Sequence, residues 1–234
     1  MNNMIYKPKN LANEYASLAL NIYDSCSHAC SYPCYNYLRR GQKYYENVGV
    51  LKKFDLTKLR EESRFYSGQK VFLSFLSDCY QPINKKLKYT RAVLKIFLEA
   101  GVIPVILTKG EITDWDVIKE FEEIHVGTTI TTLTKFRDWE PYCLSPLDRL
   151  ELLKTAFTNG CHVWVSFEPI INVDDCLIFV DQSIGLKPFY WFGKWNYNEK
   201  ARNIDWIEAV KKIKAKMKEY NYTKYQLKSS LNMI

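Results

Sequence analysis

The sequence predicts an α/β fold, a partial (β/α)6 TIM-type barrel in which parallel strands alternate with helices. Three observations support this prediction: six short apolar segments recur along the chain, stretches with helical periodicity separate them, and no internal repeat or low-complexity linker interrupts the series. Short apolar strands that alternate with amphipathic helices are typical of a parallel sheet. Six units are too few for the closed eight-stranded barrel, and an open doubly wound sheet is the alternative.

The predicted elements follow one another in order. The strands are expected at residues 19–23, 70–78, 102–110, 125–133, 162–171 and 188–196. The helices are expected at residues 90–101, 114–124, 145–160, 173–185 and 203–220. Ser145 is expected to cap the third helix, and Pro146 to take its first position, because both residue types favour these places. We expect one domain over residues 1–234, with a barrel core at about 21–198 and a C-terminal helix and tail at 203–234.

Composition limits the class of protein. The 234 residues are 47% hydrophobic and 15% aromatic, as expected of a globular chain rather than a disordered one. The seven cysteines are an odd number and the N-terminus lacks an apolar run, so we expect a reducing, cytoplasmic setting. No apolar stretch is long enough to predict a membrane span. The net charge of +7 is compatible with a nucleic-acid partner without identifying one, and nothing here predicts an oligomeric state.

A short segment after the first predicted strand carries three cysteines at a spacing of C-x3-C-x3-C: Cys26, Cys30 and Cys34. Thiolates are soft ligands that suit iron–sulfur clusters, zinc or copper(I). Two other interpretations stay open, a helix face of buried core thiols and a structural zinc site with His28 as the fourth ligand. Pro33 argues against a helix, because it lacks a backbone donor and restricts Tyr32, so we predict a loop.

Polar residues end the predicted strands, where the active sites of βα barrels lie. They are Ser77, Asp78 and Cys79 after the second strand, Thr108 and Lys109 after the third, Thr131 on the fourth, Glu168 after the fifth, and Lys194 and Asn196 after the sixth. Their gathering at one rim predicts a site there. Cys79 is a candidate hydrogen-atom donor, although a packed thiol is the simpler interpretation.

The cysteine segment resembles the cluster loop of radical S-adenosylmethionine (SAM) enzymes, C-x3-C-x-φ-C with φ aromatic. Tyr32 matches φ, but Pro33 is inserted between it and Cys34. Over about residues 21–198 the chain also resembles the spore photoproduct lyase family and its relatives, in the patterns D-x-Y-Q-P…T-R…L-T-K, E-P…S-P-x-x-R-L and E-P-I-I. These patterns fall on Asp78, Tyr80, Gln81, Pro82, Thr90, Arg91, Leu107, Thr108, Lys109, Glu140, Pro141, Ser145, Pro146, Arg149, Leu150, Glu168, Pro169, Ile170 and Ile171.

The resemblance implies a 4Fe–4S cluster and SAM. Three thiolates leave one iron of the cluster open, and SAM would chelate it and be cleaved reductively to a 5′-deoxyadenosyl radical that removes hydrogen from a substrate. By this resemblance Cys26, Cys30 and Cys34 bind the cluster. The remaining expected contacts to SAM or substrate are Tyr32 near the adenine, Ser77 and Asp78 near the methionine, Lys109 at the carboxylate, Thr131 and Glu168 near the ribose, and Lys194 and Asn196 at the rim.

Catalytic roles are expected for Lys109 and Glu168, with Cys79 as the candidate donor. A flavodoxin- or ferredoxin-like electron donor is the expected partner. The reaction is expected to be of lyase or transferase type, and by family analogy alone the substrate is a nucleic-acid base or nucleotide, with a small molecule or peptide left open. A zinc- or cluster-binding barrel without radical catalysis is the alternative function.

Overall fold

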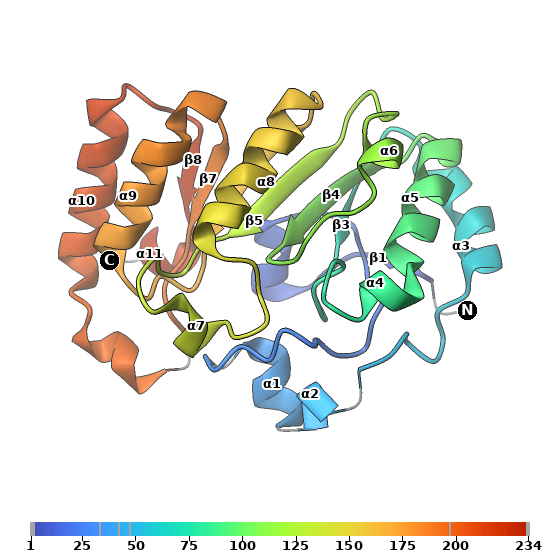
Figure 1. Cartoon of the computed structure of the whole chain (residues 1–234), viewed down its shortest axis with the longest axis horizontal. Coiled ribbons are helices and arrows are strands. Elements are labelled where there is room, and N and C mark those ends of the chain that lie inside the picture. Colours follow the sequence, from blue (N-terminus) through green and yellow to red (C-terminus); the bar gives the residue numbers. More distant parts are fainter. Residues whose placement is uncertain (1–2, 33, 42, 47, 197, 233–234) are drawn as a thin grey trace.

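The computed structural model describes residues 3–32, 34–41, 43–46, 48–196 and 198–232, so that Pro33 lies outside the described residues. Its strands form one sheet with the spatial order β1-β2-β3-β4-β5-β6-β7-β8 (Figure 1). The strands are β1 (Ile5–Tyr6), β2 (Ala19–Leu20), β3 (Lys70–Leu73), β4 (Ile103–Thr108), β5 (His125–Thr129), β6 (His162–Phe167), β7 (Phe189–Phe192) and β8 (Tyr225–Leu227). From β2 to β8 each strand runs parallel to the next, whereas β1 is antiparallel to β2.

Because the strand order never reverses, every crossover runs in the same direction and the helices cover one face of the sheet (Figure 1). A doubly wound sheet would reverse its order at a switch point, so the alternative topology is wrong. The helices are α1 (Tyr35–Arg40), α2 (Lys43–Glu46), α3 (Leu56–Ser63), α4 (Asn84–Leu87), α5 (Tyr89–Ala100), α6 (Trp115–Ile118), α7 (Phe136–Trp139), α8 (Pro146–Thr158), α9 (Val173–Ser183), α10 (Trp206–Glu219) and α11 (Ser229–Asn232). The architecture is the predicted partial barrel.

All six predicted strands are confirmed as β2 to β7, although each is shorter than its apolar run. The cap of α8 is also confirmed, because Ser145 Oγ accepts from Asp148 N while Asp148 Oδ2 accepts from Ser145 N. The helix predicted at 114–124 was wrong in length. Glu120 N donates to Val117 O, and this tighter turn ends α6 early.

The two faces of the sheet have different cores. Between sheet and helices lies a large core of mixed aliphatic and aromatic side chains, whereas the concave face carries a small cluster around Phe72 and Trp164. Tyr15, from the segment between β1 and β2, stacks on Phe72 with ring centroids 5.9 Å apart. Trp164 can lie against β5 only because residue 127 is glycine, since a Cβ there would lie 2.4 Å from the indole. The open half-barrel is thus lined with rings.

None of the helices in the described parts of the chain combines the length and the apolar character that crossing a membrane requires.

Candidate functional site

The cysteine segment leaves β2 as an irregular loop, as predicted, and two residues of the D-x-Y-Q-P pattern hold it in place. Gln81 Oε1 accepts from Ser27 N at 2.6 Å, and Gln81 Nε2 donates to Ser25 O at 2.9 Å. His28 Nε2 lies 3.0 Å from Asp78 Oδ2, and His28 Nδ1 lies 3.0 Å from Tyr142 O. Both ring nitrogens of His28 therefore have protein partners, which removes His28 as a fourth metal ligand.

Asp78 joins this loop to the end of β4. Its carboxylate accepts from Thr108 Oγ1 and from Lys109 N, both at 2.7 Å, in addition to His28. Burial opposes ionisation, but His28 and these hydrogen bonds outweigh it and hold the pKa of Asp78 below its ordinary value. Asp78 thus fixes the loop onto the rim, a supporting role that the sequence did not reveal.

A cavity of about 270 Å³ opens between the loop and the C-terminal ends of the strands. Eight of the predicted site residues line it: Cys26, Cys30, Tyr32, Cys34, Ser77, Asp78, Lys109 and Glu168. The three cysteines and Tyr32 come from the loop, and the other four residues come from three different strand ends, so the fold brings the predicted rim together.

Four predicted site residues do not line this cavity. Cys79 is fully buried in the large core between sheet and helices, in keeping with a packed thiol. Thr131 is also fully buried, and its hydroxyl donates to Glu140 at 3.4 Å. Lys194 Nζ lies 5.3 Å from the centre of the Trp206 ring, and Asn196 follows it outside the lining. All four residues lie at or after a strand end, which is why the sequence predicts them at the rim. Their side chains nevertheless point in different directions, because side-chain direction differs from one strand end to the next.

The three thiols suit a cluster better than a single ion. Among the described residues, no three His, Cys, Asp or Glu side chains are placed to hold one metal ion. The thiolates of a four-iron cluster each bind a different iron, so they need to surround a cavity rather than converge on a point. Cys26, Cys30 and Cys34 meet that requirement by lining one cavity, and all three are free.

Lys109 brings a positive charge to the cysteines of the loop. Its Nζ lies 3.1 Å from Cys30 Sγ and donates to Tyr32 Oη at 2.5 Å. Burial opposes its charge, but neighbouring anionic groups, led by the Cys30 sulfur, outweigh burial and raise the pKa of Lys109 well above its ordinary value. A hydrogen bond from Cys143, acting against burial and together with Lys109, lowers the pKa of Cys30 to about 5. The sulfur of Cys30 and the ammonium of Lys109 thus lie side by side at the centre of the site.

On the opposite wall Glu168 is held by residues from both ends of the chain. Its Oε2 accepts from Tyr15 Oη at 2.7 Å and from Lys228 Nζ at 2.6 Å. Gly193 makes room for it, since a Cβ there would lie 2.8 Å from the carboxyl carbon. Sequence reasoning missed Tyr15 and Lys228, because they lie outside the alternation of predicted strands and helices and no motif marks them.

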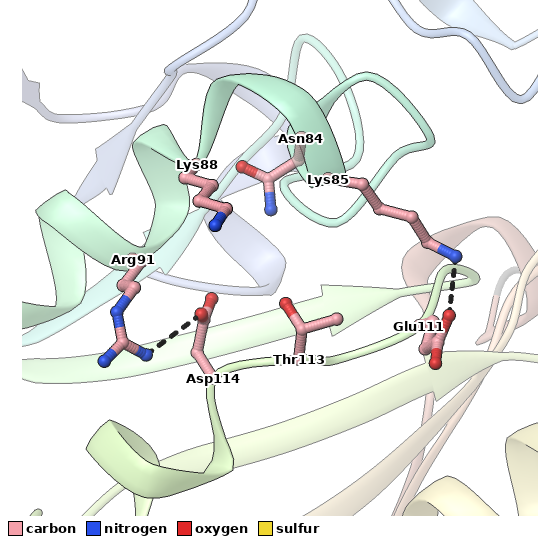
Figure 2. Close-up of a pocket in the computed structure, with 7 residues that line it drawn as sticks. All are labelled: Asn84, Lys85, Lys88, Arg91, Glu111, Thr113 and Asp114. Atoms are coloured by element: carbon pink, nitrogen blue, oxygen red, sulfur yellow. Dashed lines mark hydrogen bonds and ion pairs between the residues drawn. The ribbon is translucent and has the colours of Figure 1, made fainter.

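A second cavity, of about 480 Å³, lies between α4, the start of α5 and the loop after β4. Figure 2 shows its lining residues: Asn84, Lys85, Lys88, Arg91, Glu111, Thr113 and Asp114. Lys85 Nζ lies 2.6 Å from Glu111, and Arg91 lies 3.3 Å from Asp114 and 2.6 Å from Asp116. Arg91, part of a family pattern, is thus tied to carboxylates away from the cysteine loop.

Comparisons with known proteins give one relative in sequence and several neighbours in fold. No family model matches the chain. It is 34% identical, over 187 residues, to the uncharacterized protein MJ0683 of Methanocaldococcus jannaschii. The aligned region covers 76% of this chain and 70% of that protein. Among solved structures, a spore photoproduct lyase variant with bound AdoMet and dinucleoside spore photoproduct superposes with a TM-score of 0.68 at 13% identity, over 94% of this chain and 78% of the lyase. SuiB of Streptococcus suis bound to S-adenosylmethionine superposes with a TM-score of 0.59 at 11% identity, over 89% of this chain and 45% of SuiB. At these identities, the two structural likenesses establish a common fold.

Proposed function

Because the chain belongs to the same family as the M. jannaschii protein MJ0683 and has the radical SAM fold of spore photoproduct lyase, we propose that it is a radical SAM enzyme. One observation carries the proposal: three cysteines of a single loop and the ammonium of Lys109 face one cavity at the C-terminal rim of a partial barrel. Cys26, Cys30 and Cys34 would hold a 4Fe–4S cluster with one iron left open for SAM. When bound, the cluster and SAM supply radical chemistry that removes a hydrogen atom from a substrate.

The chain's own residues would bind and orient SAM. Lys109 supplies a point charge for its carboxylate, which an ammonium on a flexible stem suits. Ser77 lies beside the loop for the methionine end, and Glu168, held by Tyr15 and Lys228, is placed for ribose hydroxyls or a substrate cation. The rings that line the concave face exclude water from the reacting groups.

The proposed reaction is of lyase or transferase type and needs an external one-electron donor of flavodoxin or ferredoxin type. We propose a nucleic-acid base or nucleotide as the substrate class. A flat base could stack on Phe75, which lines the cavity and is only partly buried, and the lyase structure of the same fold holds a dinucleoside. All seven cysteines are free, in keeping with a reducing, cytoplasmic setting for such a cluster.

The test is anaerobic reconstitution with iron and sulfide, followed by SAM and a strong reductant. We expect a brown protein that forms 5′-deoxyadenosine. A colourless protein with stoichiometric zinc would contradict the cluster, and a fully loaded cluster that forms no 5′-deoxyadenosine would leave a binding barrel without radical catalysis. Deuterated nucleosides, oligonucleotides and peptides then identify the substrate, because deuterium from the true substrate enters 5′-deoxyadenosine.

A further inference from the structure

Behind the cysteine loop lies a charged pair that the proposed function does not use. Glu140 follows α7, Arg149 lies on α8, and both side chains are completely buried. Arg149 Nη2 donates to Glu140 Oε2 at 2.5 Å, and Arg149 Nη1 donates to Thr129 O at 2.8 Å. Burial opposes the charge on Glu140, but Arg149 and Lys109 outweigh it and lower the pKa of Glu140 to about 2. The pair is ionised inside the protein.

The second oxygen of Glu140 points the other way, toward the site. Glu140 Oε1 accepts from Tyr32 Oη at 2.7 Å and lies 3.6 Å from Lys109 Nζ. Tyr32 Oη in turn accepts from Lys109 Nζ, so the three groups form a closed triangle. Lys109 Nζ also contacts Cys30 Sγ at 3.1 Å. The carboxylate therefore connects Arg149 to Lys109 and to Tyr32 of the cysteine loop.

Stability alone does not account for such a pair. Replacing a buried ion pair by apolar side chains of similar volume is often neutral or stabilising, because the cost of removing both charges from water cancels their attraction. A lysine, by contrast, loses much rotamer freedom when its ammonium is fixed, and needs a partner that holds it in place. Glu140 provides that partner, and Arg149 keeps Glu140 in place.

We propose that Glu140 and Arg149 are positioning residues that hold Lys109 against Cys30 and Tyr32 of the cysteine loop, so that the Lys109 ammonium faces SAM. The proposal rests on the proposed function for the identity of the ligand. The positioning itself is a property of the protein without cluster or SAM, and can be measured there.

The decisive variant is the double substitution E140Q/R149M. Glu140→Gln alone leaves the Arg149 charge buried without a counter-charge and is expected to lower Tm severely, whereas the double variant removes both charges and is expected to recover most of that loss. Glu151→Gln is the matched control, because Glu151 makes an exposed pair with Lys154, 2.7 Å away, on the same helix. Tyr32→Phe removes only the hydroxyl that joins Glu140 to Lys109.

The first measurement is acylation of Lys109 in the cluster-free protein, followed by mass spectrometry. We expect the double variant to be modified at least about threefold faster than the wild type and Glu151→Gln to match the wild type. Equal rates in the double variant and the wild type would overturn the proposal. This result does not depend on whether the protein binds a cluster, so it separates failure of the positioning from failure of the proposed function.

The second measurement is the Kd of SAM for the reconstituted proteins under anaerobic conditions, with iron content as the check on loading. We expect the double variant to carry as much iron as the wild type and to bind SAM at least about tenfold more weakly, with a smaller loss in Tyr32→Phe. Wild-type affinity in a double variant with a recovered Tm would contradict the positioning role.

Discussion

The cavity at the cysteine loop and the cavity beside α4 differ in a way that separates a candidate site from a surface hollow. The larger, of about 480 Å³, is walled by exposed ion pairs such as Lys85 with Glu111. The smaller, of about 270 Å³, is walled by thiols, a nearly buried lysine and a carboxylate held from both ends of the chain. Size alone would select the larger cavity, although concave sites owe their chemistry to a few converging polar groups. Position at the strand ends and unusual chemistry select the smaller one.

The largest expected difference between the cavities is in metal content. Cys30→Ala removes one of the three proposed ligands, and we expect almost complete loss of iron after anaerobic reconstitution. Cys161→Ala is the control, because Cys161 is also buried but directly precedes β6, at the N-terminal ends of the strands and so opposite the rim that carries the loop. Iron and sulfide analysis decides the matter, and equal loss in both variants would show that folding rather than ligation is lost.

A lysine from each cavity gives the next contrast. Lys109→Ala removes a nearly buried charge that is proposed to meet the SAM carboxylate, and a hydrogen bond to a charged group is worth roughly 1.5–3 kcal/mol, or about ten- to a hundredfold in Kd. Lys88→Ala removes a charge from the larger cavity, and we expect no change in Kd. Anaerobic equilibrium binding of SAM measures both. Unchanged affinity in Lys109→Ala would show that the role assigned to this lysine is wrong.

The hydroxyl of Tyr15, in the wall of the smaller cavity, should contribute to the stability of the fold. Tyr15→Phe deletes a hydroxyl that lies 2.8 Å from Ser166 Oγ and donates to Glu168, so we expect the free energy of unfolding to fall by about 1–3 kcal/mol. Urea denaturation measures the loss. The tyrosine ring would stay packed on Phe72, so retention of wild-type stability would mean that the hydroxyl bonds contribute little.

The smallest effect is expected at the surface pair of the larger cavity. Lys85→Ala breaks the contact with Glu111, but both side chains are more than half exposed, and water and salt screen such pairs. We expect Tm and SAM affinity to match the wild type. A clear drop in either, by calorimetry or binding, would give the larger cavity a role that its charges do not suggest.

The sequence predicted most of the strands and the cysteine loop, but only part of the candidate site. Apolar periodicity located β2 to β7, and the spacing of the cysteines located the loop, because both patterns are local. Tyr15 and Lys228 could not be located, since their positions at the site depend on β1 and β8, short strands that exist only by pairing with the sheet edges. Thr131 and Cys79 were placed at the rim by strand position, but their side chains point into the packed interior. Glu140 was noticed as a motif residue, yet its connection to Lys109 required three dimensions.

The three cysteines of the loop are proposed to hold a cluster with one iron open to SAM. Electron paramagnetic resonance of the reduced, reconstituted protein examines this arrangement, because SAM bound at the open iron would change the cluster spectrum. We expect a 4Fe–4S signal that shifts when SAM is added and that is absent in Cys30→Ala. A well-formed signal that SAM leaves unchanged, or no cluster signal at all, would contradict the account.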